Sequence, residues 1–187
     1  MQAITIAWMT AEAAVSLFAA WTASSPALLA FGGDSAIELM SAVVVLWRFC
    51  TNAAQDHAER RAARIAARLL FALAACVVVA SVVSLLGYSE PKPSLPGIAI
   101  LMAAAAFMPL LSREKRRLST LTGSAALRAD AAESALCGYL SLIALAGLGA
   151  NGVWRVAWAD PAAALLIIPL VLREGWEAMR GKACGCG

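Results

Sequence analysis

The feature that most constrains this chain is a series of six apolar segments, each close to the length of a membrane-spanning helix. A helix needs about 20 mostly apolar residues to cross the hydrocarbon layer of a bilayer. The segments cover residues 4–22, 27–49, 67–88, 96–111, 121–150 and 156–172. They are rich in Ala and Leu and do not alternate in polarity, which argues against membrane strands. The sequence therefore predicts an all-α, polytopic membrane protein with six transmembrane helices.

The composition agrees with this prediction. Hydrophobic residues make up 61% of the 187 residues and charged residues only 14%, whereas an average soluble domain is about 25% charged. A soluble domain, a disordered chain and a nucleic-acid binder are thereby excluded. We expect one transmembrane transport domain over residues 1–173. We expect residues 174–187 to be a short cytoplasmic tail, in which Cys184-Gly185-Cys186 could capture a soft metal.

The basic residues predict an orientation. With six alternating spans, thirteen of the 15 Lys and Arg residues flank the second and fourth connections or follow the last span. Only Lys92 and Arg155 fall on the other side. The positive-inside rule then places both termini in the cytoplasm. We expect a multi-pass protein of the cell inner (plasma) membrane.

Acidic residues within the predicted spans are the most informative for function. Glu12 lies in the first span, Asp34 and Glu38 in the second, and Asp130 and Glu133 in the fifth. A charged carboxylate at mid-membrane costs about 2.5–3.5 kcal/mol on insertion scales. Such acids must therefore carry a proton or share a cation, and a cluster that can do both in turn suits a cation/proton exchanger. A lone acid such as Glu12 is more often a helix–helix hydrogen bonder or a gating group.

The spacing of these residues predicts a shared metal site. Asp34 and Glu38 are four residues apart, as are Glu133 and Cys137, so each pair lies on one helix face. At 1.5 Å per residue, Glu38 lies about 18 Å from the outer end of the second span. Glu133 lies about 18 Å from the inner end of the fifth span, so both are close to the midplane of a layer about 30 Å thick. Asp130 is a fifth ligand, an entry-side relay, or the true helix-five partner if that helix is rotated. Spans two and five run in opposite directions, as expected of a 3+3 inverted repeat with a midplane site.

These residues resemble the cation diffusion facilitator family of divalent-metal transporters. The resemblance lies in residues 25–38 (SPALLAFGGDSAIE), 127–137 (LRADAAESALC) and 158–161 (WADP). It implies a minimal member without the family's cytoplasmic C-terminal domain. The usual helix-five pair of His and Asp is absent, and the matching positions hold Glu133 and Cys137. The family also implies dimerisation, which makes a homodimer a further expectation.

The resemblance and the acids together predict efflux of a divalent metal coupled to proton antiport, with metal ion, protons and the bilayer as partners. Oxygen ligands favour Mn²⁺, Fe²⁺ or Mg²⁺-like ions, and a Cys137 thiolate favours Zn²⁺, Co²⁺ or Cd²⁺. The family resemblance favours Zn²⁺. Two alternatives stay open: a metal-binding channel or uniporter, and a metal-sensing scaffold without proton coupling.

An enzyme is not expected, because the spans hold no His and no Ser–Lys pair. Asp160, which stands before Pro161, is expected to cap the sixth helix.

Overall fold

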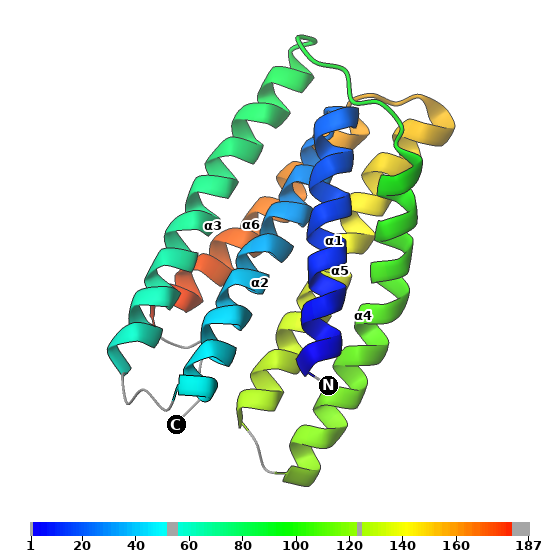
Figure 1. The fold of residues 1–187 in the computed structure, drawn as a ribbon. Helices are drawn as coiled ribbons and strands as arrows, with labels where there is room; N and C mark the ends of the chain where they lie inside the picture. The colour runs from blue at the N-terminus through cyan, green and yellow to red at the C-terminus, as the bar shows by residue number, and fades with distance from the viewer. Residues whose placement is uncertain (1, 52–55, 123–124, 181–187) are drawn as a thin grey trace.

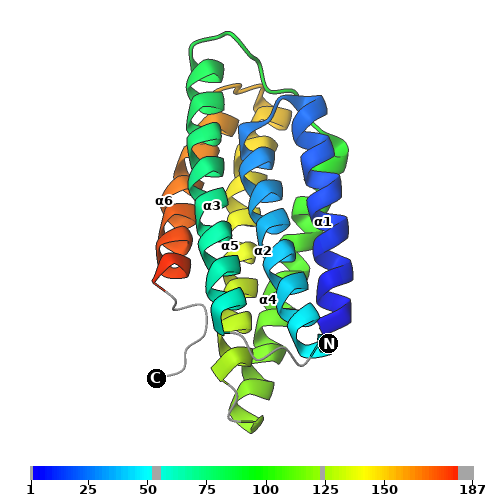
Figure 2. The ribbon, with the colours of Figure 1, turned by 60° about the vertical axis from the view of Figure 1, so that its left-hand side comes forward.

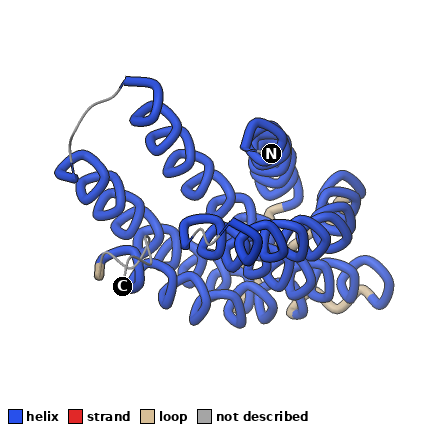
Figure 3. Tube along the Cα trace, turned by 90° about the horizontal axis from the view of Figure 1, so that it is seen from below, coloured by secondary structure: helices blue, strands red, loops and turns tan. Residues whose placement is uncertain are grey.

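Six helices make up nearly all of the chain in a computed structural model, which describes residues 2–51, 56–122 and 125–180 (Figure 1). Their bounds are α1 Gln2–Ala23, α2 Pro26–Thr51, α3 Asp56–Leu85, α4 Leu95–Thr122, α5 Ala125–Trp154 and α6 Ala159–Met179. Successive helices run in opposite directions, so the start of α1 and the end of α6 both lie toward the lower end in Figures 1 and 2. Within these ranges there is no strand (Figure 3), and the prediction of an all-helical chain is confirmed.

Four helices are long and apolar enough to cross a membrane. Their candidate spans are Thr5–Ala23 in α1, Arg64–Leu85 in α3, Leu95–Leu121 in α4 and Ala131–Trp154 in α5. Many large apolar side chains face outward, including Phe18, Val79 and Leu166. A soluble protein rarely exposes so much contiguous apolar surface, whereas lipid tails cover it without cost. The chain is therefore a membrane-embedded helical protein.

The packing pairs helices in a regular way. α1 contacts α2, and α2 contacts α3; likewise α4 contacts α5, and α5 contacts α6. Between these two sets of three, α1 packs on α4, α2 on α5 and α3 on α6. An additional contact joins α2 to α6, and this is the interface that holds the acids described below.

Small residues let the helices approach closely. The core contains fully buried alanines on several helices, among them Ala30, Ala104 and Ala164. A Cβ added to Gly32 would lie 2.5 Å from Ser16 Oγ on α1. Close contact between small residues is how helices associate where there is no hydrophobic drive between them.

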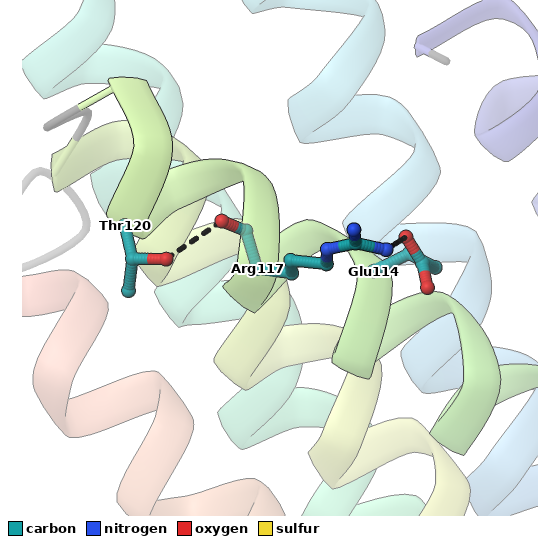
Figure 4. A network of polar contacts seen from close by, with 3 residues as sticks. All are labelled: Glu114, Arg117 and Thr120. Carbon is teal, nitrogen blue, oxygen red and sulfur yellow. Dashed lines mark hydrogen bonds and ion pairs between the residues drawn. The ribbon is translucent and has the colours of Figure 1, made fainter.

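The charge run at residues 113–117 is part of α4 and not a connection. The sequence reading ends this helix at Leu111, but α4 continues to Thr122. On its exposed face, Arg117 pairs with Glu114 at 3.9 Å, and Thr120 Oγ1 donates to the Arg117 carbonyl at 2.7 Å (Figure 4). The opposite face is buried, and there Lys115 is 1% exposed and donates to Ser134 of α5 at 2.9 Å. The expectation that the helices hold no Ser–Lys pair is therefore wrong, because α4 continues past Leu111 and carries Lys115 into the bundle. The amphipathic pattern, and not the charge of the run, decides its structure.

An interhelical hydrogen-bond group, here called the upper clasp, joins the upper ends of α2 and α6. Asp160 Oδ2 accepts a hydrogen bond from Ser25 Oγ at 2.6 Å, and Oδ1 accepts one from the Ala27 N–H at 3.2 Å. Ser25 Oγ in turn accepts from the Leu28 N–H at 3.2 Å, so it caps α2. The expectation that Asp160 caps its own helix is wrong, because the residue before α6 makes no side-chain cap and the Asp160 carboxylate serves α2.

Candidate metal centre

Three carboxylates meet at the interface of α2 and α6. We call Asp34, Glu38 and Glu174 the carboxylate cluster: one oxygen from each lies within 4.8 Å of the others. Asp34 is 1% exposed, and the other two side chains are half-buried. Three oxygen donors at this separation are close enough to share one cation, and carboxylate oxygens suit hard and borderline divalent ions.

The local sequence explains why these acids converge. Asp34 and Glu38 are one helical turn apart and share a face of α2. On α6, Ile167, Val171 and Gly175 form a buried face, and Glu174 lies at its edge. Gly175 packs near Leu70 of α3, with 3.4 Å between an added Cβ and the Leu70 Cβ. The small residue therefore lets α6 approach its neighbours at the level of the cluster.

The enclosed oxygens of the cluster lack hydrogen-bond donors. Asp34 Oδ1, Glu38 Oε1 and Glu174 Oε2 are each buried, and none has a hydrogen-bond partner among the described residues. An ionised carboxylate only accepts hydrogen bonds, and a buried charge must be paired or neutralised. These atoms therefore require a proton or a cation.

The electrostatic surroundings of the cluster are acidic. Besides the members themselves, the described groups whose charges act on Asp34 and Glu38 are Glu12 and Glu133. Like charges gathered in a low-dielectric region repel one another strongly. A bound cation or shared protons would reduce this repulsion.

The structure brings together some of the predicted ligands and not others. Asp34 and Glu38 lie in the carboxylate cluster. Glu133 is exposed on α5, and its charge nevertheless reaches Asp34 and Glu38. Cys137 is 2% exposed, and its thiol donates to Glu12 at 3.1 Å. The backbone of Asp130 belongs to α5, but its side chain lies outside the described residues, as do Cys184 and Cys186.

Glu174 is the member that the sequence reading missed. That reading ends the sixth span at Leu172 and assigns Glu174 to the tail, whereas α6 continues to Met179. Two signals for a longer helix are present in the sequence. Arg173 and Glu177 are four residues apart and form an ion pair at 2.9 Å, and Gly175 continues the spacing of Ile167 and Val171.

The comparisons with known proteins add no family. No protein-family model matches the chain, and no curated protein is significantly similar to it.

Proposed function

We propose that this protein binds a divalent metal cation at the carboxylate cluster and carries it across the membrane in exchange for protons. The observation that carries the proposal is the set of three converging carboxylates whose enclosed oxygens have no donor. Buried acids in a membrane protein are costly and are a common feature of ion and proton pathways.

The proposed exchange follows from charge balance. When the metal ion binds, protons leave the cluster, and when protons return, they displace the ion. Interacting carboxyl groups titrate as a coupled set, so occupancy by one cation changes the proton affinity of the whole group. The direction we propose is efflux, with metal loading from the cytoplasm.

We further propose that all six helices span the bilayer as a 3+3 inverted repeat. In support, each of α1, α2 and α3 packs against the helix three positions later, and the members of each such pair run in opposite directions (Figure 1). A pseudo-two-fold axis in the membrane plane produces this pattern, and transporters of this kind place the ion site near the midplane. Both termini are then cytoplasmic in an inner (plasma) membrane, in keeping with the distribution of Lys and Arg.

Zn²⁺ is the ion we favour, with Mn²⁺, Fe²⁺, Co²⁺ and Cd²⁺ as alternatives. Carboxylate oxygens by themselves favour harder ions such as Mn²⁺ and Fe²⁺, and it is the family resemblance that favours Zn²⁺. The resemblance to cation diffusion facilitators belongs to this proposal, and its helix-five ligands, Glu133 and Cys137, stay predictions. A homodimer also stays a prediction.

Flux measurements in proteoliposomes test the proposed function. We expect purified protein to drive Zn²⁺ movement that depends on an imposed pH gradient. Asp34→Asn and Glu174→Gln should each reduce the initial rate at least about tenfold, since each removes a charged ligand. Glu114→Gln is the control, because Glu114 is an exposed acid on α4 that pairs with Arg117 and takes no part in the carboxylate cluster; it should keep the wild-type rate.

Other outcomes would replace the proposal with a different function. Zn²⁺ flux that ignores the pH gradient would favour a channel or uniporter. Zn²⁺ binding in detergent without flux would favour a sensing or scaffolding role. Equal flux in wild type, Asp34→Asn and Glu174→Gln would remove the carboxylate cluster from any transport site.

A further inference from the structure

A second polar group lies inside the bundle, separate from the carboxylate cluster. We call Glu12, Ser35 and Cys137 the thiol site. Glu12 Oε1 accepts hydrogen bonds from Ser35 Oγ at 2.9 Å and from the Cys137 thiol at 3.1 Å. The three residues come from α1, α2 and α5. Three helices that are distant in sequence therefore present a carboxylate, a hydroxyl and a thiol to one point.

The Glu12 carboxylate has an unfilled bonding position. Glu12 is 0% exposed, and its Oε2 atom has no hydrogen-bond partner among the described residues. The groups that interact with this carboxylate are Cys137, Ser35 and the indole N–H of Trp8, and none of them carries a positive charge. Trp8 Nε1 is buried and makes no hydrogen bond of good geometry either, so it does not satisfy Oε2 in this arrangement. Leaving a buried acceptor unsatisfied costs about 1–3 kcal/mol, and more when the group is charged. This oxygen therefore points to a missing partner.

The thiol site lies among apolar residues in the interior of the bundle. Trp8, which lies beside the Glu12 carboxylate, packs against Phe107 of α4 with ring centroids 4.7 Å apart. Ala13 is 5% exposed, and Leu140, one turn after Cys137, is fully buried. In such an apolar enclosure, a cation bound by both sulfur and oxygen would gain more from its ligands than it would in water.

We propose that the thiol site is a second binding site for a thiophilic divalent cation, held by Cys137 Sγ, the Glu12 carboxylate and Ser35 Oγ. The thiolate is the metal-binding form of cysteine, so the thiol proton leaves when the ion binds. Sulfur selects Zn²⁺ or Cd²⁺ over Mg²⁺ or Mn²⁺. A role for the thiol site in transport rests on the proposed function. Metal binding at the thiol site does not, and it can be measured separately.

The two sites are adjacent. Ser35 follows Asp34 directly on α2, so neighbouring residues of one helix belong to the two different sites. The charges of Glu12 act on Asp34 and Glu38, and those of Asp34 and Glu38 act on Cys137. An ion in one site would therefore be repelled by an ion in the other. Mutual repulsion of this kind lets multi-site pathways release ions that each site binds firmly.

Cd²⁺ titration of the purified full chain tests the thiol site directly. Cadmium bound to a thiolate gives an ultraviolet charge-transfer band, whereas cadmium on carboxylates does not. The test protein replaces Cys50, Cys76, Cys184 and Cys186 by Ser, which leaves Cys137 as the single thiol. We expect one saturable band per chain and its complete loss in Cys137→Ser.

Two variants separate the thiol site from the carboxylate cluster. In the single-thiol protein, Glu12→Gln should weaken Cd²⁺ binding, measured by the band, at least about tenfold because it removes the charged ligand. Glu174→Gln should change the affinity less than Glu12→Gln. Absence of the band in a monodisperse single-thiol protein, or equal affinity in Glu12→Gln, would overturn the thiol site. Loss of the proposed transport with the band retained would overturn the proposed function alone.

Discussion

At the scale of single residues, the chemistry of this protein depends on carboxyl groups that are buried without donors. Asp34 illustrates the point, because it is 1% exposed and its Oδ1 atom has no partner in the described structure. A buried charge left without compensation weakens a fold, and a cation that compensates it stabilises the same fold. If Asp34 binds an ion as we propose, ion binding should therefore be measurable as a gain in stability.

Asp34→Asn should remove the stabilising effect of metal. Without divalent ions, we expect this variant to be more stable than wild type by about 1–3 kcal/mol, because it removes one of several mutually repelling acids. Zn²⁺ should raise the melting temperature of wild type and have little effect on Asp34→Asn. Thermal unfolding in detergent, with chelator or with Zn²⁺, measures both. An equal Zn²⁺-induced shift in the two proteins would contradict a role for Asp34 as ligand.

Part of the site can be predicted from sequence because helical spacing is local. Asp34 and Glu38 share a face in any helix, so their pairing follows from four residues of separation. Glu174 joins them only through the packing of α6 on α2, which no local rule gives. Cys137 shows the same limit: its partner is Glu12, 125 residues away, and not the residue one turn before it.

At the scale of helices, close packing depends on where a methyl group fits. A Cβ on Gly147 of α5 would lie 2.9 Å from the Ala159 carbonyl oxygen of α6 and would also overlap the Ala163 side chain. A Cβ on Gly149, two residues later, would meet nothing within 4 Å. The contact of α5 with α6 therefore depends on one glycine and not on the other.

Gly147→Ala should destabilise the protein by about 1–3 kcal/mol, because backbone must move to relieve the overlap. Gly149→Ala is the matched control and should be neutral or stabilising by up to about 1 kcal/mol, since Ala favours helix over Gly. Thermal unfolding of the two purified variants in the same detergent gives the comparison. Equal loss in both would mean that helix propensity, and not the α5–α6 contact, controls this position.

The upper clasp leads to a second prediction about helix packing. Asp160→Ala leaves the Ser25 hydroxyl and the Ala27 N–H without their acceptor and should cost about 1–3 kcal/mol. Asp160→Asn keeps one oxygen acceptor and should cost less. The free energy of unfolding of the two variants, measured by denaturant titration in mixed micelles, checks the order. A smaller loss for Asp160→Ala than for Asp160→Asn would refute the clasp.

Helix positions were largely predictable, and helix ends were less so. The predicted apolar segments each correspond mainly to one helix, because a long apolar run has few other stable forms in a membrane. The ends of α4 and α6 lie further along the chain than apolarity alone predicts. Both extensions are amphipathic, with Lys115 and Gly175 facing inward. The periodic spacing of their buried residues indicates a helix, whereas hydropathy averaged over a window does not distinguish these extensions from a polar connection.

At the scale of the whole molecule, the charged helix extensions lie at one end of the bundle. α4 and α5 extend beyond the other helices at the lower end (Figures 1 and 2), where the exposed Arg113, Arg116 and Arg117 lie. The upper end carries Lys92 and Arg155. By the positive-inside rule, this difference predicts that the lower end faces the cytoplasm.

Thiol labelling of intact cells tests this orientation. In a background with every native Cys replaced by Ser, Glu90→Cys places a thiol in the connection between α3 and α4, at the upper end. Arg116→Cys places one on exposed α4 at the lower end. We expect a membrane-impermeant maleimide to label Glu90→Cys on intact cells and to reach Arg116→Cys only after permeabilisation. The opposite pattern would invert the proposed topology.

The upper clasp has a mechanical consequence for the ion site. Asp160 and Glu174 are 14 residues apart on one helix, which is about 21 Å at 1.5 Å per residue. With the far end pinned, a swing of α6 by about 5° would displace the Glu174 oxygens by about 2 Å. Metal–ligand bonds tolerate departures of only about 0.2 Å. Pro169, a natural point of bending, lies between the two residues, so a slight pivot of α6 would be enough to release an ion from the proposed site.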